Sequence, residues 1–196
     1  TKGLIGIRRK NANSFETIVS GLNIEGPKRN YNDLMFIKKG KLLIAGGTYT
    51  PTARGYRAGT LMSYENGKWT NFDEGAAAKA IGYDIRDFLD IAVDPDDANH
   101  YFVSSFGEGV IEIKDNAFVQ LYNHKNTPLR PALETEQEHY VRVGGICFDK
   151  NKNLWMTNCS APNGIVVRTV DGTWKSLFFK GVSNATFIGR IMITSK

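Results

Sequence analysis

Four segments of this chain repeat one pattern, and that repeat limits the folds open to it. Each begins with a glycine, continues as a short apolar strand and a turn, and then opens a second strand on an aromatic residue. The segments are GLIGIRRKNANSFETI from Gly3, GTLMSYENGKWTNF from Gly59, GVIEIKDNAFVQLY from Gly109 and GIVVRTVDGTWKSL from Gly164. The glycines are 56, 50 and 55 residues apart. A fixed period of about 40 to 50 residues is typical of stacked structural repeats.

A second pair of strands recurs between these hairpins. It consists of an apolar strand, a polar turn and another apolar strand, as in NDLMFIKKGKLLIAGG, DIAVDPDDANHYFVSS and GGICFDKNKNLWMTN. Each period therefore holds four short strands in two hairpins, and the tract DEGAAAKAIG is expected to add one helical turn at most. A four-stranded sheet of this kind buries both faces only against its neighbours, so the pattern predicts an all-β fold of β-propeller blades.

The strand count predicts an incomplete propeller. Residues 1–20 are expected to form the outer hairpin of a first blade, and residues 187–196 the inner strand of a last one. Between them, 33–72, 88–122 and 143–179 are predicted to be full blades, so that residues 1–196 form one partial propeller. We therefore expect a fragment of a larger propeller, with the remaining blades of the parent protein as neighbours.

Composition and charge argue against two classes of partner. No stretch approaches the roughly 18 consecutive apolar residues of a membrane span. The net charge is +5, but the basic residues are scattered and form no recognisable nucleic-acid module, so binding of nucleic acid is not expected.

The two cysteines, Cys147 and Cys159, flank the turn KNKN on neighbouring strands. Folding the hairpin about this turn sets Cys147 opposite Met156 and Cys159 opposite Gly144. The sulfurs should then be too far apart for a disulfide, and we expect two buried free thiols.

No group of residues predicts catalysis. The histidines lie in different connections and lack the spacing of metal ligands, so we expect neither an enzyme nor a cofactor. Asp94, Asp96 and Asp97 could supply oxygen ligands to calcium, but they occupy a turn in which solvated carboxylates are common. The alternative is a propeller lyase or hydrolase with its site at the mouth of the channel.

The long connections are predicted to share one face. They are residues 21–32, 47–58, 73–86, 123–141 and 180–187, whereas the turns within hairpins are short. Insertions on one face of a repeat array usually mark its binding surface, and Tyr and Arg are enriched at binding hot spots. The candidate binding residues are Tyr49, Arg54, Tyr56, Arg57, Arg130, His139, Tyr140, Arg142, Asn158 and Asn163. For any one of them, a purely structural place in its loop is the alternative.

The segment NKNLWMTN, residues 151–158, resembles the core of the two-component-regulator propeller repeat, which forms the periplasmic sensor region of hybrid histidine kinases in Bacteroidetes. A longer stretch, about residues 84–178, is similar to the propeller of PorZ-like proteins. It includes DIAVDPDDANHYFVSSFGEGVIEIKDNAFVQLYNHKNTPL and VRVGGICFDKNKNLWMTN. PorZ-like proteins are surface-associated accessory components of type IX secretion in the same bacteria. KKGKLLIAGG departs from the repeat, which would have an aromatic strand there.

The resemblance implies an extracytoplasmic protein of a Gram-negative bacterium, in the periplasm or at the outer surface. Its propeller would be a non-catalytic recognition or scaffold module whose ligand is a protein or a glycan. A kinase-linked sensor and a secretion accessory protein both remain open, because propellers host many functions.

Overall fold

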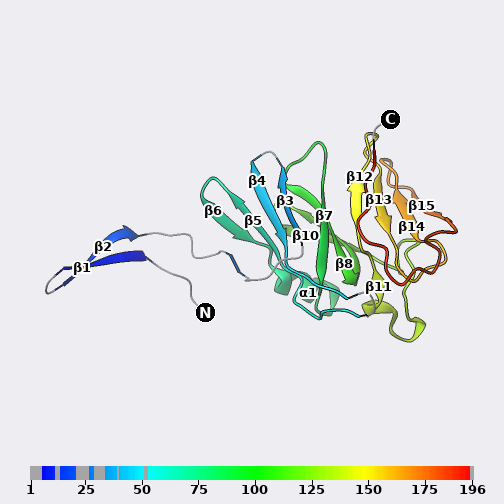
Figure 1. Cartoon of the computed structure of the whole chain (residues 1–196), viewed down its shortest axis with the longest axis horizontal. Helices are drawn as coiled ribbons and strands as arrows, with labels where there is room; N and C mark the ends of the chain where they lie inside the picture. Colours follow the sequence, from blue (N-terminus) through cyan, green and yellow to red (C-terminus); the bar gives the residue numbers. More distant parts are fainter. Residues whose placement is uncertain are drawn as a thin grey trace.

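The computed structural model describes residues 6–11, 14–20, 27–28, 34–38, 40–50 and 53–194. Its sheets form three consecutive antiparallel blades, and the hairpin of β1 (Gly6–Asn11) and β2 (Ser14–Ser20) stands apart from them (Figure 1). The first blade contains β3 (Leu34–Lys38), β4 (Lys41–Ala45), β5 (Leu61–Glu65) and β6 (Lys68–Asn71). The second contains β7 (Phe88–Val93), β8 (His100–Gly107), β9 (Gly109–Lys114) and β10 (Ala117–Tyr122). The third contains β12 (Ile146–Phe148), β13 (Leu154–Thr157), β14 (Ile165–Arg168) and β15 (Trp174–Leu177).

Three short elements lie in the connections. Helix α1 (Glu74–Ile81) follows the first blade, and the 3-10 helix η1 (Glu134–His139) precedes β11 (Val141–Arg142). Strand β11 pairs with the end of β8 and adds a fifth, two-residue strand to the second sheet. The fold is thus an all-β propeller arc, as the repeat predicted. Among the described residues, no helix is long and apolar enough to span a membrane.

Apolar layers between adjacent blades hold the arc together. The layer between the first two blades contains Leu43, Phe72, Phe88 and Val103, all at most 1% exposed. In the next layer the ring of Phe102 meets that of Phe148 edge to face, with 5.7 Å between centroids. Each blade therefore contributes alternate residues of its strands to a neighbour, which is the packing that a period-2 apolar pattern requires.

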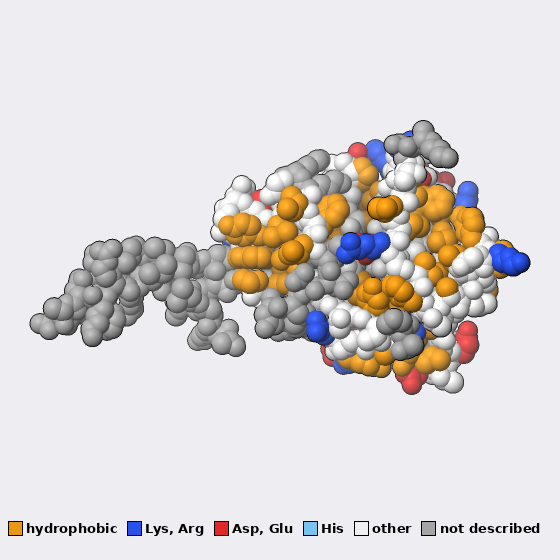
Figure 2. All heavy atoms as spheres, viewed as in Figure 1, with side chains coloured by type: hydrophobic (Ala, Val, Ile, Leu, Met, Phe, Trp, Pro, Cys, Tyr) orange, Lys and Arg blue, Asp and Glu red, His pale blue; other side chains and the backbone are white. Residues whose placement is uncertain are grey.

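The first blade also has an apolar face on its other side. Met35 pairs with Ile44 and Ile37 with Leu42 across β3 and β4, so these four side chains share one face. Met35 is 60% and Ile37 75% exposed, and Figure 2 shows hydrophobic side chains gathered over this part of the molecule. This face has the same apolar character as the faces that are buried between the blades.

Helix α1 is longer than the sequence predicted. It spans eight residues, about two turns, because both of its ends are capped. The side chain of Asp73 accepts a hydrogen bond from the amide of Ala76 at 3.0 Å, and Gly82 ends the helix at φ +97° with its N–H on Ala78 O. The prediction of a single turn was wrong because it gave these two capping signals too little weight.

Both cysteines are free thiols, but the predicted register of their hairpin was wrong by one residue. Cys147 lies opposite Trp155, because the turn closes with a hydrogen bond from Asp149 N to Asn153 O. Lys152 adopts φ +62°, which lets three residues rather than four make the turn. Cys159 is buried as expected, whereas Cys147 is only half-buried.

The predicted last strand is not formed within residues 187–194, which have no ladder with another described strand. This segment lies beside Thr157, whose hydroxyl contacts Ile188 O at 3.3 Å. The same hydroxyl accepts the amides of Gly144 and Gly145 at 3.1 and 2.9 Å, so Thr157 links the start of the third blade to this segment. Residues 1–5, 195 and 196 lie outside the described residues, as does most of 21–32.

Candidate functional site

Three long connections meet at one end of the blades. Residues 47–50 with 53–58, 73–86 and 123–141 lie at the end where α1 and β11 are found, whereas the turn joining β5 to β6 lies at the opposite end (Figure 1). The first and third of these connections are in direct contact, because Arg54 of the first donates a hydrogen bond to the carbonyl oxygen of His139 in the third.

A buried ion network forms the base of this end. The guanidinium of Arg54 donates to Glu108 Oε1 at 2.7 Å and to the carbonyl oxygen of His139 at 2.7 Å, and its Nε lies 3.5 Å from Asp87 Oδ2. The side chain of Arg54 is 2% exposed and those of Asp87 and Glu108 are 0% exposed. A charged group is stable at such depth only when opposite charges and hydrogen bonds surround it, as they do here.

Backbone amides satisfy the remaining carboxylate oxygens. Asp87 adopts φ +52°, and its two oxygens accept the amides of Tyr56 and Arg57 at 2.9 Å each. Glu108 Oε2 accepts Arg86 N at 3.0 Å and the Ser105 hydroxyl at 2.8 Å. The network therefore ties the 47–58 loop to the start of β7 and the end of β8.

Gly107 makes room for the guanidinium. A Cβ atom added there would lie 2.2 Å from Cζ of Arg54, so the guanidinium would have to move away from its buried partners. The glycine of the Phe-Gly-Glu-Gly sequence is thus required by the close approach of Arg54 to the backbone of β8.

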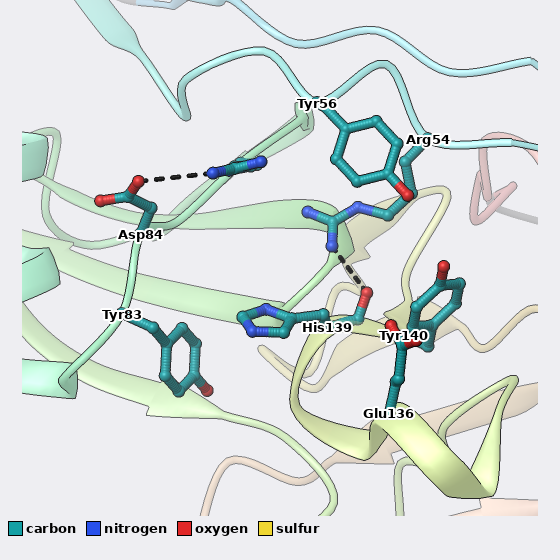
Figure 3. A pocket seen from close by; sticks show the side chains of 8 residues that line it. Arg54, Tyr56, Tyr83, Asp84, Glu136, His139 and Tyr140 are labelled. Carbon is teal, nitrogen blue, oxygen red and sulfur yellow. Dashed lines mark hydrogen bonds and ion pairs between the residues drawn. The ribbon is translucent and has the colours of Figure 1, made fainter.

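A pocket of about 270 Å³ lies on this base (Figure 3). Its lining residues are Arg54, Tyr56, Tyr83, Asp84, Arg86, Glu136, His139 and Tyr140. Tyr56 is 56% exposed, and the side chains of Arg86 and His139 are 40% and 42% exposed. The rim of the pocket is therefore accessible, while Arg54 beneath it is not.

Rings and cations alternate around the pocket. The Tyr56 ring lies 5.2 Å from the guanidinium carbon of Arg54 and 5.9 Å from that of Arg86. The Tyr83 ring meets His139 edge to face at 5.0 Å. These are the distances at which a cation is attracted to the face of an aromatic ring and at which ring pairs pack favourably.

Two of the tyrosines that line the pocket, Tyr83 and Tyr140, have a raised pKa. Burial, together with the nearby carboxylates of Glu138 and Glu108, raises the pKa of Tyr83 to about 12. A hydrogen bond with the Tyr56 hydroxyl, followed by burial, raises the pKa of Tyr140. At neutral pH these hydroxyls can therefore both donate and accept hydrogen bonds.

The structure brings four of the ten predicted binding residues into the pocket, namely Arg54, Tyr56, His139 and Tyr140. Four further lining residues were missed: Tyr83, Asp84, Arg86 and Glu136. The first three lie directly after α1, and the sequence signal for them was the end of that helix at Gly82.

Several of the other candidates are engaged within the protein. The Tyr49 ring stacks on Phe187 at 4.7 Å between centroids, and Arg142, 9% exposed, packs over Phe106 at 5.1 Å. Asn158 is fully buried, and its side chain holds both the amide and the carbonyl of Arg130, at 2.7 and 3.0 Å.

Two candidates are partly exposed. Asn163 donates to the Ser176 hydroxyl, and Arg57 is half-buried beside Asp87. Binding by the ten residues stays a prediction, but the burial of Arg54, Arg142 and Asn158 places them in the framework.

The weak calcium candidate gains no support. Asp94 accepts the amide of Asp96 and contacts His100 Nδ1 at 2.8 Å, and Asp97 accepts the amide of Asn99. Asp96 pairs with Lys152 at 2.5 Å. In the described part of the chain, no group of three or more His, Cys, Asp or Glu side chains could hold a metal ion.

Comparison with known proteins bears on the fold. No family model matches the chain, and no curated protein matches it. Two solved structures match the chain with TM-scores below 0.5. A gluconolactonase of Xanthomonas campestris is 13% identical with a TM-score of 0.49, over 91% of this chain and 57% of its own. YCF48 bound to D1 peptide is 15% identical with a TM-score of 0.47, over 88% and 46%.

The structure of PorZ from Porphyromonas gingivalis is a stronger match. PorZ is described as an essential surface component of the type IX secretion system. The match has a TM-score of 0.74 and 28% sequence identity over 88% of this chain, and it spans 23% of the PorZ chain. The chain is thus a β-propeller segment with the PorZ-like fold.

Proposed function

We propose that this chain is a non-catalytic recognition segment of an extracytoplasmic bacterial propeller, and that its long-loop end binds a protein or a glycan. The observation that carries the proposal is the pocket of about 270 Å³, in which accessible rings and charged groups stand on a fully buried ion network. The likeness to a surface component of type IX secretion supports a secretion accessory role over a kinase-linked sensor. In this view, further blades of a parent propeller lie beside the three described blades.

Rigidity of the base supports recognition. The loop that carries Tyr56 is fixed by two hydrogen bonds to Asp87 and by the ion pair of Arg54 with Glu108. A site whose residues are already held in place loses less conformational entropy when a partner binds. Tyr and Arg at its rim can supply large contact area and directional hydrogen bonds.

The carboxylates along the innermost strands support the absence of catalysis. Asp90 and Asp149 line an apolar groove of about 510 Å³ between β7, β12 and residues 190–193. Asp90 accepts the amides of Ile91 and Ile146 at 2.9 and 3.1 Å. Asp149 accepts the indole N–H of Trp155 at 2.9 Å, among other donors. Carboxylates already engaged by donors of the protein itself support a structural role for these two residues.

The test is a comparison of defined peptide and glycan arrays probed with the wild-type chain and two variants. A double variant, Tyr56→Ala with Tyr140→Ala, removes two accessible rings of the pocket. Val119→Ala on β10 is the control, since Val119 is 47% exposed and lies outside the pocket. Binding that is lost in the double variant and kept in the control supports the proposal. Binding that both variants retain would place recognition elsewhere.

A further inference from the structure

The volume of the pocket limits what it can hold. Drug-sized ligands occupy pockets of about 300 to 1,000 Å³. The pocket of about 270 Å³ falls just below this range. It therefore suits one side chain of a larger partner, or a group of similar size, rather than an extended ligand.

The rings of the site already pack against guanidinium groups. Tyr56 lies beside both Arg54 and Arg86, and the guanidinium of Arg142 lies 5.4 Å from the centroid of Tyr140. The negative face of an aromatic ring attracts cations, most strongly where water is excluded. The chain's own arginines thus show which kind of group these rings accommodate.

The charge of the site is negative. Arg54, Arg86 and Arg142 are outnumbered by four carboxylates that line the pocket or lie directly beneath it, namely Asp84, Asp87, Glu108 and Glu136. Arg54 is committed to the buried network, and Arg86 pairs only loosely with Asp84 at 3.5 Å. Glu136 is exposed, and its carboxylate has no hydrogen bond or ion pair with another described side chain. An anionic ligand would meet this excess of negative charge, whereas a cation would reduce it.

We propose that the pocket receives a cationic side chain, arginine in preference to lysine, from a protein partner. This inference rests on the proposed function and names its ligand class. The planar guanidinium stacks on tyrosine rings and presents a fork of N–H donors to a carboxylate such as Glu136. Recognition of a protein then follows, because a single arginine side chain fills the pocket while the surrounding loops contact the rest of the partner.

The test uses acetyl-Gly-Arg-Gly-amide and the same tripeptide with citrulline, which has the shape of arginine but no charge. Binding is followed by amide chemical shifts of Tyr56, His139 and Tyr140 in the ¹⁵N-labelled chain. We expect the arginine peptide to bind about tenfold more tightly than the citrulline peptide, and added salt to weaken it.

A matched pair of variants locates the charge. Glu136→Gln and Glu134→Gln remove the same charge from exposed positions of η1, but only Glu136 lines the pocket. Glu136→Gln should weaken the arginine peptide by about threefold to tenfold, and Glu134→Gln should leave its affinity nearly unchanged. Equal effects of the two variants, or equal binding of the citrulline peptide, would overturn the inference.

A third probe separates this inference from the proposed function. If methyl α-glucoside or the citrulline peptide binds best and Tyr56→Ala abolishes that binding, the pocket is a recognition site but its ligand is not a cation. If no probe changes the amide chemical shifts of the pocket residues, and the arrays show no binding that the Tyr56 and Tyr140 double variant loses, both proposals fail.

Discussion

Replacing Arg54 by methionine should destabilise the whole fold, although the residue belongs to a surface loop. The substitution keeps much of the aliphatic bulk and removes the guanidinium from three partners: Glu108, Asp87 and the carbonyl of His139. Breaking a buried ion pair by removing one partner costs about 3 to 5 kcal/mol. Because Glu108 keeps its bonds to Arg86 N and Ser105, we expect the free energy of unfolding to fall by about 3 kcal/mol, the lower end of that range.

The assay is urea denaturation followed by tryptophan fluorescence, with Arg86→Met as the matched control. Arg86 also lines the pocket, but its side chain is 40% exposed and its pairing with Asp84 spans 3.5 Å. Exposed pairs of this kind contribute less than about 1 kcal/mol. The two variants therefore make the same chemical change at two depths of one site.

A double variant checks the electrostatic reason. Glu108→Gln in the Arg54→Met background removes the unpaired charge, so the two losses should be less than additive by about 1 to 2 kcal/mol. If Arg54→Met costs no more than Arg86→Met, or if the two losses simply add, the buried network does not have the role assigned to it.

Three other outcomes are expected. Phe88→Ala should lower the free energy of unfolding by about 3 to 5 kcal/mol, because it leaves a cavity at a fully buried site between two blades. Ile37→Ser is the control: Ile37 is 75% exposed, and its substitution should change the free energy of unfolding by less than about 1 kcal/mol in the same urea titration. Tyr83 should titrate near pH 12 in ultraviolet difference spectra; its pKa is raised on folding, so its stabilisation is complete below about pH 10 and is lost as the pH rises toward 12. A thiol reagent should modify the half-buried Cys147 before the buried Cys159. Both reactions should be slow, because burial raises the pKa of each thiol. Equal reaction rates of the two cysteines would contradict the packing described.

The propeller blades could be predicted from the sequence because their signals are local. A glycine, a short apolar strand and a turn recur in each copy, and the turn at Asn66 and Gly67 has φ +50° and +77°, which these residue types tolerate. Register was less predictable. The hairpin of Cys147 shifted by one residue because Asp149 closes the turn earlier than the polar run KNKN indicates.

The site could be predicted only in part, because residue type does not report depth. Tyr56 and Arg54 stand two positions apart in one polar loop. Counted over the whole residue, backbone included, Tyr56 is 56% exposed and Arg54 only 6%. The difference arises from Glu108, which is 54 positions away from Arg54 and reads in sequence as part of a Gly-Glu-Gly turn. No local pattern connects the two residues, so burial of the pair appears only when the loops meet.

The contrast between Arg54 and Tyr56 also explains how one loop can serve both stability and recognition. Substitutions in the base, such as Arg54→Met, should lower both the stability of the fold and the affinity for a partner, because the base positions the rim. Substitutions at the accessible rim, such as Tyr56→Ala, should lower affinity alone, since little buried surface is lost there. A rim substitution that destabilised the fold as much as a base substitution would mean that the rings of the pocket support the propeller rather than a partner. The two kinds of variant therefore have to be measured together, with stability and binding determined for each.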